Sequence, residues 1–152
     1  MRGTTLDEID IKLLTLLQKD GRMSQQDLAA EVGLSSPATG ERLRKLEDRG
    51  IIVQYTALLD PKKLGQDVTA FVTVGIDGSK HYPAFVAKAL EHPEILECHA
   101  ITGQGSHLLK IRTPSTSSLE SLLAQVQSWR GAHWTQTNIV LSVLKETLHV
   151  SL

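Results

Sequence analysis

Residues 24–49 constrain the fold of this chain more than any other segment. Two short helical patterns flank a turn at residues 32–35, and the second pattern begins with Ser36 and Pro37, a proline suited to the first turn of a helix. This second helix carries basic side chains beside a thin apolar seam. The arrangement is typical of a helix-turn-helix, whose second helix enters the major groove of DNA. It predicts double-stranded DNA as the partner.

The net charge of the chain does not suggest DNA binding, but the charge of one short segment does. The formal net charge is −1, and acidic side chains slightly outnumber basic ones in residues 1–60. The balance is reversed in residues 36–46, where three basic side chains stand against Glu41 alone. Phosphate contacts supply most of the nonspecific affinity for DNA, so one copy with so short a basic stripe should bind weakly. The charge pattern therefore favours an oligomer.

The composition excludes several other classes of protein. With 152 residues, 41% of them hydrophobic and 22% charged, the chain has the balance of a globular protein rather than a disordered one. No run of about 18 apolar residues is present to span a membrane, and the N-terminus lacks the apolar core of a secretory signal. The single cysteine, Cys98, fits a reducing compartment. We therefore expect a cytoplasmic protein with no membrane partner.

Helical spacing and capping residues predict three helices in the first third of the chain. Asp7 is suited to cap a helix over about 7–19. Ser24 and Ser36 are suited to cap the second and third helices. The β-branched and aromatic residues at 51–59 predict a strand that follows the third helix.

The rest of the chain alternates strands and helices after a breaker segment at 60–65. The expected strands are 68–76, 95–102, 106–113 and 135–147, and the expected helices are 82–91 and 115–129. The order strand-helix-strand-strand-helix-strand is the ferredoxin-like arrangement, in which two helices cover one face of a four-stranded antiparallel sheet. The fold class is therefore α+β.

These strands carry more apolar surface than two helices need to cover. The surplus residues are Val72, Val74, Ile139, Leu141 and Val143. A second copy of the chain, packed sheet to sheet, would bury them. This predicts a dimer formed through the second half of the chain.

Four segments together resemble one family of proteins. They are LDEIDIKLLTLLQKDGRMS at 6–24, DLAAEVGLSSPATGERLRKLEDRGII at 27–52, YTALLDPKKLG at 55–65 and ECHAITGQGSHLLKIRT at 97–113. In these segments the chain resembles the Lrp/AsnC family, the feast/famine transcription regulators of bacteria and archaea. The resemblance extends from Leu6 to about Val143.

The resemblance implies a domain organisation and a mode of assembly. It implies a winged helix-turn-helix DNA-binding domain with its linker strand in residues 1–60, followed by a ferredoxin-like effector-binding and oligomerisation domain in residues 61–152. Family members form homodimers through the second domain and often assemble to octamers. An amino acid or related small molecule binds between dimers, near the hairpin loop at 103–109, and shifts assembly or DNA affinity. The implied function is a sequence-specific DNA-binding transcriptional regulator modulated by such an effector.

The candidate DNA contacts lie on the second helix of the helix-turn-helix. Its exposed N-terminal part can approach base edges through Ser35, Ser36, Ala38, Thr39 and Arg42. The residues expected to hold phosphates are Arg44, Lys45 and Arg49. Charged helix faces are often only solvated, but the preceding turn, the cap and the apolar seam favour the DNA-binding interpretation.

The candidate effector contacts surround the hairpin loop. They are Gly103, Gln104, Gly105, Ser106, His107, Thr135 and Thr137. Free backbone N–H groups in such a glycine-rich turn can hold a carboxylate, although a plain hairpin turn is the alternative. Lrp/AsnC proteins usually have an aspartate and then an aromatic residue before two leucines, where this chain has Ser106 and His107. The missing aspartate favours ligands whose other end is neutral or weakly charged.

Two other functional classes stay open at this point. The chain shows no Ser-His-Asp set, no phosphate-binding loop and no metal-spaced cluster, so we expect neither an enzyme nor a bound cofactor or metal. The alternatives are a nucleoid-type DNA-wrapping protein and a ligand sensor without a gene-specific role. A footprint separates wrapping from local regulation, because wrapping protects long periodic stretches of DNA.

Overall fold

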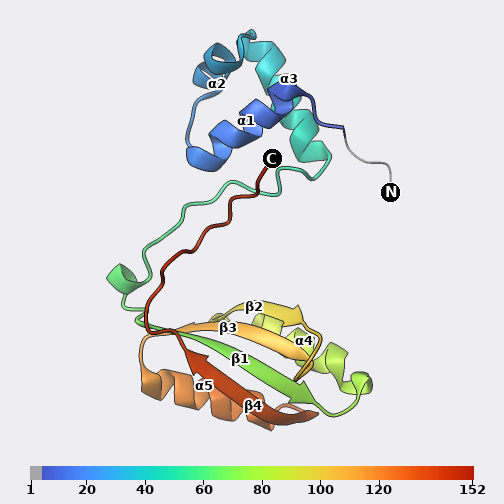
Figure 1. The fold of residues 1–152 in the computed structure, drawn as a ribbon, viewed down its shortest axis with the longest axis vertical. Coiled ribbons are helices and arrows are strands. Elements are labelled where there is room, and N and C mark those ends of the chain that lie inside the picture. The colour runs from blue at the N-terminus through green and yellow to red at the C-terminus, as the bar shows by residue number, and fades with distance from the viewer. Residues whose placement is uncertain (1–4) are drawn as a thin grey trace. The chain divides into compact units, whose positions relative to one another are not determined.

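The computed structural model describes residues 5–152, which form two compact units (Figure 1). The head comprises the chain up to Leu58 together with the tail Glu146–Leu152, and the sheet domain comprises Leu59–Lys145. Gln18 ties the tail to the head, since its side-chain amide donates to the Val150 carbonyl at 3.0 Å and accepts from the Val150 N–H at 2.6 Å. The tail, which the sequence places in the second domain, therefore groups with the head.

Three helices form the head: α1 (Glu8–Lys19), α2 (Gln25–Val32) and α3 (Ser36–Asp48). Two predicted caps are confirmed, since Asp7 accepts from the Asp10 N–H at 2.8 Å and Ser24 accepts from the Asp27 N–H at 3.1 Å. The third is wrong by one residue, because Ser35 rather than Ser36 caps α3. Leucines from the three helices make the core of the head: Leu13, Leu28 and Leu46, all at most 1% exposed.

The strand expected at 51–59 is not formed. A strand needs a partner edge for its backbone N–H and C=O groups, and the described part of a single chain offers none to this segment. Its apolar side chains are consequently exposed, with Val53 at 86% and Leu58 at 74%. Tyr55 nevertheless returns to α3, where its hydroxyl donates to Glu47 at 2.9 Å.

The sheet domain has the expected strand-helix-strand-strand-helix-strand order (Figure 1). Its strands are β1 (Val68–Ile76), β2 (Ile95–Ala100), β3 (His107–Thr113) and β4 (Ala132–Ile139), and its α-helices are α4 (Tyr82–Glu91) and α5 (Thr116–Ser128). Two short 3₁₀ turns, Lys62–Leu64 and Ser79–His81, precede β1 and α4. The sheet is antiparallel with the order β2-β3-β1-β4. The last strand ends at Ile139, eight residues before the predicted end.

Both helices cover the same face of the sheet, and the core lies between them and the strands. The buried residues of this layer are Ala70, Val72, Val74, Phe85, Ala89, Leu109, Ile111, Leu119, Leu122 and Val126. Val72 and Val74 have no exposed surface, so the expectation that they face a second subunit is wrong. Successive side chains of a strand alternate between faces, and these two face the helices. Of the surplus residues, Ile139, Leu141 and Val143 are exposed, at 49%, 96% and 56%.

Within residues 5–152, no helix is both long and apolar enough to cross a membrane.

Candidate functional site

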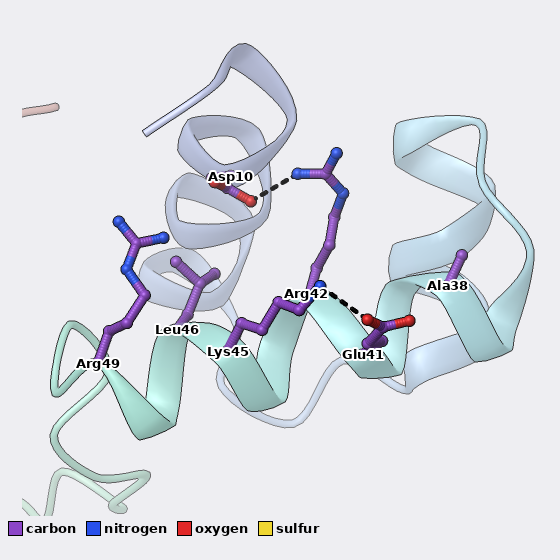
Figure 2. Close-up of a pocket in the computed structure, with 7 residues that line it drawn as sticks. All are labelled: Asp10, Ala38, Glu41, Arg42, Lys45, Leu46 and Arg49. Carbon is purple, nitrogen blue, oxygen red and sulfur yellow. Dashed lines mark hydrogen bonds and ion pairs between the residues drawn. The ribbon is translucent and has the colours of Figure 1, made fainter. Parts of the chain in front are cut away.

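The exposed surface of α3 is the first candidate site (Figure 2). Its N-terminal cap, Ser35, is exposed, and so are Ala38, Glu41 and Lys45, which follow one another at helical spacing. Beside them a hollow of about 370 Å³ runs along the α3 surface to Asp10 of α1. Because Ala38 is small and its exposed neighbours are polar, this face of α3 is accessible to a large ligand.

Arg42 does not belong to that exposed surface. Its guanidinium forms an ion pair with Asp7, the cap of α1, at 2.6 Å. It forms a second one with Asp10 of α1 at 2.9 Å (Figure 2). The Asp10 backbone N–H and the Arg42 guanidinium lower the pKa of Asp7, and the two carboxylates raise the pKa of Arg42. Arg42 was expected to contact bases, and the structure instead shows its Nη1 group joining α3 to α1, which turns the guanidinium toward Asp7 and Asp10.

Removing this ion pair should destabilise the head. Arg42→Ala leaves the Asp10 side chain, only 10% exposed, without its cationic partner. Because Arg42 itself is one-third exposed, we expect a loss of about 1–2 kcal/mol in the free energy of unfolding. Urea unfolding checks this, with Arg49→Ala on the same helix as the matched control that should change stability by less than about 0.5 kcal/mol. Equal losses in both variants would contradict the structural role of Arg42.

Two further predicted base contacts are placed differently by the structure. Thr39 is completely buried, and its hydroxyl donates to the Ser35 carbonyl at 3.1 Å. It cannot contact a thymine methyl, so that expectation is corrected. Ser36 is half-buried and accepts from the side chain of Gln25 through its hydroxyl at 3.1 Å. Ser36 is therefore only partly accessible, and its side chain joins α3 to α2.

The predicted phosphate contacts are all exposed. Lys45 pairs with Glu41 at 2.7 Å, one helical turn away, with both side chains more than half exposed. In the described residues, Arg44 and Arg49 form no ion pair within 4 Å. An exposed pair such as Lys45–Glu41 contributes little to stability and opens at low cost when a phosphate approaches. The sequence interpretation did not single out Glu41, although its helical spacing from Ala38 and Lys45 was visible.

The loop between β2 and β3 is the second candidate site. Gly103 and Gly105 adopt φ values of +97° and +82°, which favour glycine. The Ser106 N–H donates to the Val74 carbonyl at 2.9 Å and fixes the end of the loop to β1. By contrast, the backbone N–H groups of residues 102–105 donate to no acceptor among residues 5–152. The loop therefore offers free donors that suit a carboxylate.

Three of the predicted effector contacts point into the helix-covered face of the sheet. His107 is only 2% exposed and packs against the rings of Tyr82 and Phe85 at centroid distances of 4.8 and 5.2 Å. Burial lowers the pKa of His107, which keeps the ring neutral at pH 7. Thr135 and Thr137 pair in register with Val74 and Val72, so they also lie on the helix-covered face. The structure therefore removes these three residues from an open ligand site.

A hollow of about 400 Å³ lies beside the loop. It is lined by residues 75–77, Tyr82, residues 105–106 and residues 133–134. Of the predicted contacts, Gly105 and Ser106 line it. The sequence interpretation missed the residues contributed by the end of β1 and the start of β4, because only the sheet register brings them next to the loop. We call this depression the sheet hollow.

Both units of the chain match families of known proteins. The family described as winged helix-turn-helix DNA-binding matches residues 6–53, and the Lrp/AsnC ligand binding domain matches residues 69–150. The chain belongs to the Lrp/AsnC family. It is an α+β protein with a winged helix-turn-helix head, and a ligand-modulated, DNA-binding transcriptional regulator.

Relatives of this Lrp/AsnC regulator match it over nearly their whole length. The HTH-type transcriptional regulator FL11 of Pyrococcus furiosus is 37% identical over 147 residues, covering 97% of this chain and 96% of FL11. The leucine-responsive regulatory protein of Salmonella typhimurium is 37% identical over 148 residues, covering 95% and 90% of the two chains. A transcriptional regulator of Neisseria meningitidis, solved as a complex with L-methionine, has a TM-score of 0.92 at 34% identity and covers 97% of each chain.

The ionisable side chains of residues 5–152 are not grouped as a metal centre in this Lrp/AsnC regulator. In the part of the chain that the structure describes, no group of three His, Cys, Asp or Glu residues is placed to hold an ion. Glu97, for example, is occupied by His99 at 3.0 Å and Lys110 at 3.2 Å. The two sites with binding geometry are therefore the α3 surface and the sheet hollow.

Proposed function

We propose that this regulator reads duplex DNA with one face of α3 and carries an amino-acid effector in the sheet hollow. The observation that carries the proposal is the exposed α3 face, where a small residue at the first turn is followed by unburied polar and basic side chains. The residues assigned to DNA are Ser35, Ala38, Glu41, Arg44, Lys45 and Arg49, which are all exposed. A helix-turn-helix docks by placing the N-terminal part of its second helix in the major groove.

The α3 side chains divide into two roles. Ser35, Ala38 and Glu41 lie toward the N-terminal end, where the helix meets base edges; a glutamate there can accept from the amino group of cytosine. Arg44, Lys45 and Arg49 lie further along the helix and hold phosphates. Base contacts give specificity, whereas phosphate contacts give affinity and salt dependence.

Lys45→Ala tests the phosphate role. It should weaken binding to specific and random duplexes alike and reduce the slope of log affinity against log salt by about one unit, because one counterion fewer is released. Fluorescence anisotropy across a salt series measures both quantities. Lys80→Ala, an exposed lysine of the sheet domain, is the control that should leave both unchanged. A loss confined to the specific site would instead make Lys45 a base contact.

The assembly of the regulator is the second part of the proposal. The segment 51–59 and the residues after β4 expose large apolar side chains, among them Leu58 at 74%, Leu141 at 96% and Leu144 at 94%. Monomeric proteins rarely leave so many unburied, so these segments fit an interface between copies of the chain. We expect a homodimer at least, and assembly to octamers as in the family. Sedimentation velocity at micromolar concentration checks this, and a monomer there would contradict it.

The effector completes the proposal. The Neisseria meningitidis relative was solved with L-methionine, which supports an amino acid or similar molecule as the ligand of this chain. The free N–H groups of residues 102–105 supply donors for its carboxylate. Such binding would shift assembly or DNA affinity where the ligand prefers one state of the protein, since it displaces the equilibrium toward that state. The regulator works on the chromosome, and its cytoplasmic location remains a prediction that this role supports.

A further inference from the structure

The sheet hollow has its own chemistry, beyond an affinity for amino acids in general. We propose that it selects a zwitterionic amino acid with an aromatic side chain, with Asp77 holding the ammonium group and Trp134 packing against the ring. This inference rests on the proposed effector function and names the ligand class. Three observations carry it: the seat of the indole, the carboxylate at the rim, and the donors of the adjacent loop.

Two glycines leave the space that the indole of Trp134 occupies. Gly75 lies opposite Trp134 in the β1–β4 register, and a Cβ added to Gly75 would lie 2.1 Å from the indole Nε1. A Cβ added to Gly105 would lie 3.4 Å from the far end of the same ring. The indole therefore spans from the end of β1 to the β2–β3 loop. It keeps 37% of its surface exposed, so it forms a wall of the hollow.

Asp77 supplies the negative charge of the hollow. Its backbone N–H donates to the Gly131 carbonyl at 2.7 Å, which fixes the residue where β1 ends beside β4. Its side chain is exposed and makes no hydrogen bond or ion pair with any of residues 5–152. No other lining residue carries a carboxylate. An unpaired carboxylate at the edge of a ligand-sized hollow suits an ammonium group.

This placement leads us to a different ligand class from the one that the sequence suggests. Ser106, at the position where related proteins usually have an aspartate, donates through its hydroxyl to the Val74 carbonyl at 3.2 Å and carries no charge. That substitution predicts a ligand with a neutral end opposite its carboxylate. Asp77, on a neighbouring strand end, restores the missing charge from a different position. The ligand can therefore be a full zwitterion, with its carboxylate at the free N–H of Gly105, the residue of the 102–105 segment that lines the hollow.

The walls of the hollow favour an aromatic side chain. Trp134 and Tyr82 both line it, although the whole chain contains only two tryptophans and two tyrosines. Aromatic rings gain from offset or edge-to-face contact with one another beyond the burial of apolar area. A branched aliphatic side chain gains the burial but not this contact. The volume of about 400 Å³ lies at the small end of the range for small-molecule sites.

Calorimetric titration of the full chain with the common amino acids and one analogue tests the inference. L-phenylalanine, 3-phenylpropionate, which lacks the ammonium group, and L-leucine are compared. We expect L-phenylalanine to bind at least about tenfold more tightly than either of the others. Asp77→Asn should remove the preference over 3-phenylpropionate, whereas Asp67→Asn, at the other end of β1, should keep it. Gly75→Ala should weaken L-phenylalanine by displacing the indole, and circular dichroism confirms that each variant is folded.

The outcomes separate this inference from the proposed function. L-leucine or L-methionine binding as tightly as L-phenylalanine would overturn the aromatic selectivity and leave an amino-acid effector in place. An Asp77→Asn variant that still prefers L-phenylalanine over 3-phenylpropionate would overturn the role of Asp77. Failure of every common amino acid to bind or to change DNA affinity would overturn both this inference and the proposed effector function.

Discussion

Ala38→Glu should reduce the affinity for the specific DNA site by at least about 100-fold. Ala38 is exposed on the first turns of α3, where the proposed interface approaches the base edges. Glutamate adds bulk at the point of closest approach and a second negative charge beside Glu41, facing a polyanion. Fluorescence anisotropy with a labelled operator duplex measures the loss, and the thermal unfolding of the head should stay within a few degrees of the parent.

Ala87→Glu is the matched control for this change. Ala87 is exposed on a helix of the sheet domain, so the same substitution there adds the same charge to the chain without entering the proposed interface. Its effect on DNA affinity should be less than about threefold, the size expected from net charge alone. If Ala38→Glu bound DNA as well as Ala87→Glu does, the N-terminal part of α3 would not lie in the groove.

The helices of the head were predictable from the sequence because local signals determine them. Asp7 and Ser24 each accept a backbone N–H three residues later, which needs no knowledge of the rest of the fold. The one-residue error at Ser35 has the same origin. Two adjacent serines are both competent caps, and Pro37 is tolerated at either of the first two helical positions, so the local signals do not choose between them.

The roles of individual α3 residues were not predictable, because they depend on distant partners. The carboxylates that engage Arg42 are 35 and 32 residues away in the sequence. Thr39 is buried by the packing of the three helices, although its position in the sequence suggests an exposed first turn. Local pattern predicts which helix contacts DNA, but helix packing decides which of its side chains are free to do so.

The sheet shows the same division between local and distant information. The bounds of β1 and α4 match their predictions, since apolar alternation and helical spacing specify each segment. Alternation divides a strand into two faces but does not say which face the helices cover. For this reason Val72 and Val74 were expected to face a second subunit, whereas they face the helices. The sheet hollow could not be predicted from the sequence for a related reason. It is assembled from two strand ends and a loop whose proximity follows from the register alone.

Phe85→Ala should bring the sheet domain close to global unfolding. Phe85 has no exposed surface, and its ring packs against Trp129 and His107 at centroid distances of 5.4 and 5.2 Å. Emptying such a site costs about 3–5 kcal/mol, which is a large part of the 5–15 kcal/mol that stabilises a typical domain. Urea unfolding of the full chain should therefore show a much earlier transition, with the head helices melting separately.

The other phenylalanine of the chain provides the control. Phe71 is half-buried on the sheet face opposite the helices, so Phe71→Ala removes the same atoms without opening a cavity in the core. Phe71→Ala should lower the free energy of unfolding of the sheet domain by about 1–2 kcal/mol. Because one part of the proposed interface, the segment after β4, continues directly from this sheet, Phe85→Ala should also lower the sedimentation coefficient and weaken DNA binding while α3 itself stays intact. Equal destabilisation by the two substitutions would mean that Phe85 is not the centre of the core that positions the sheet hollow.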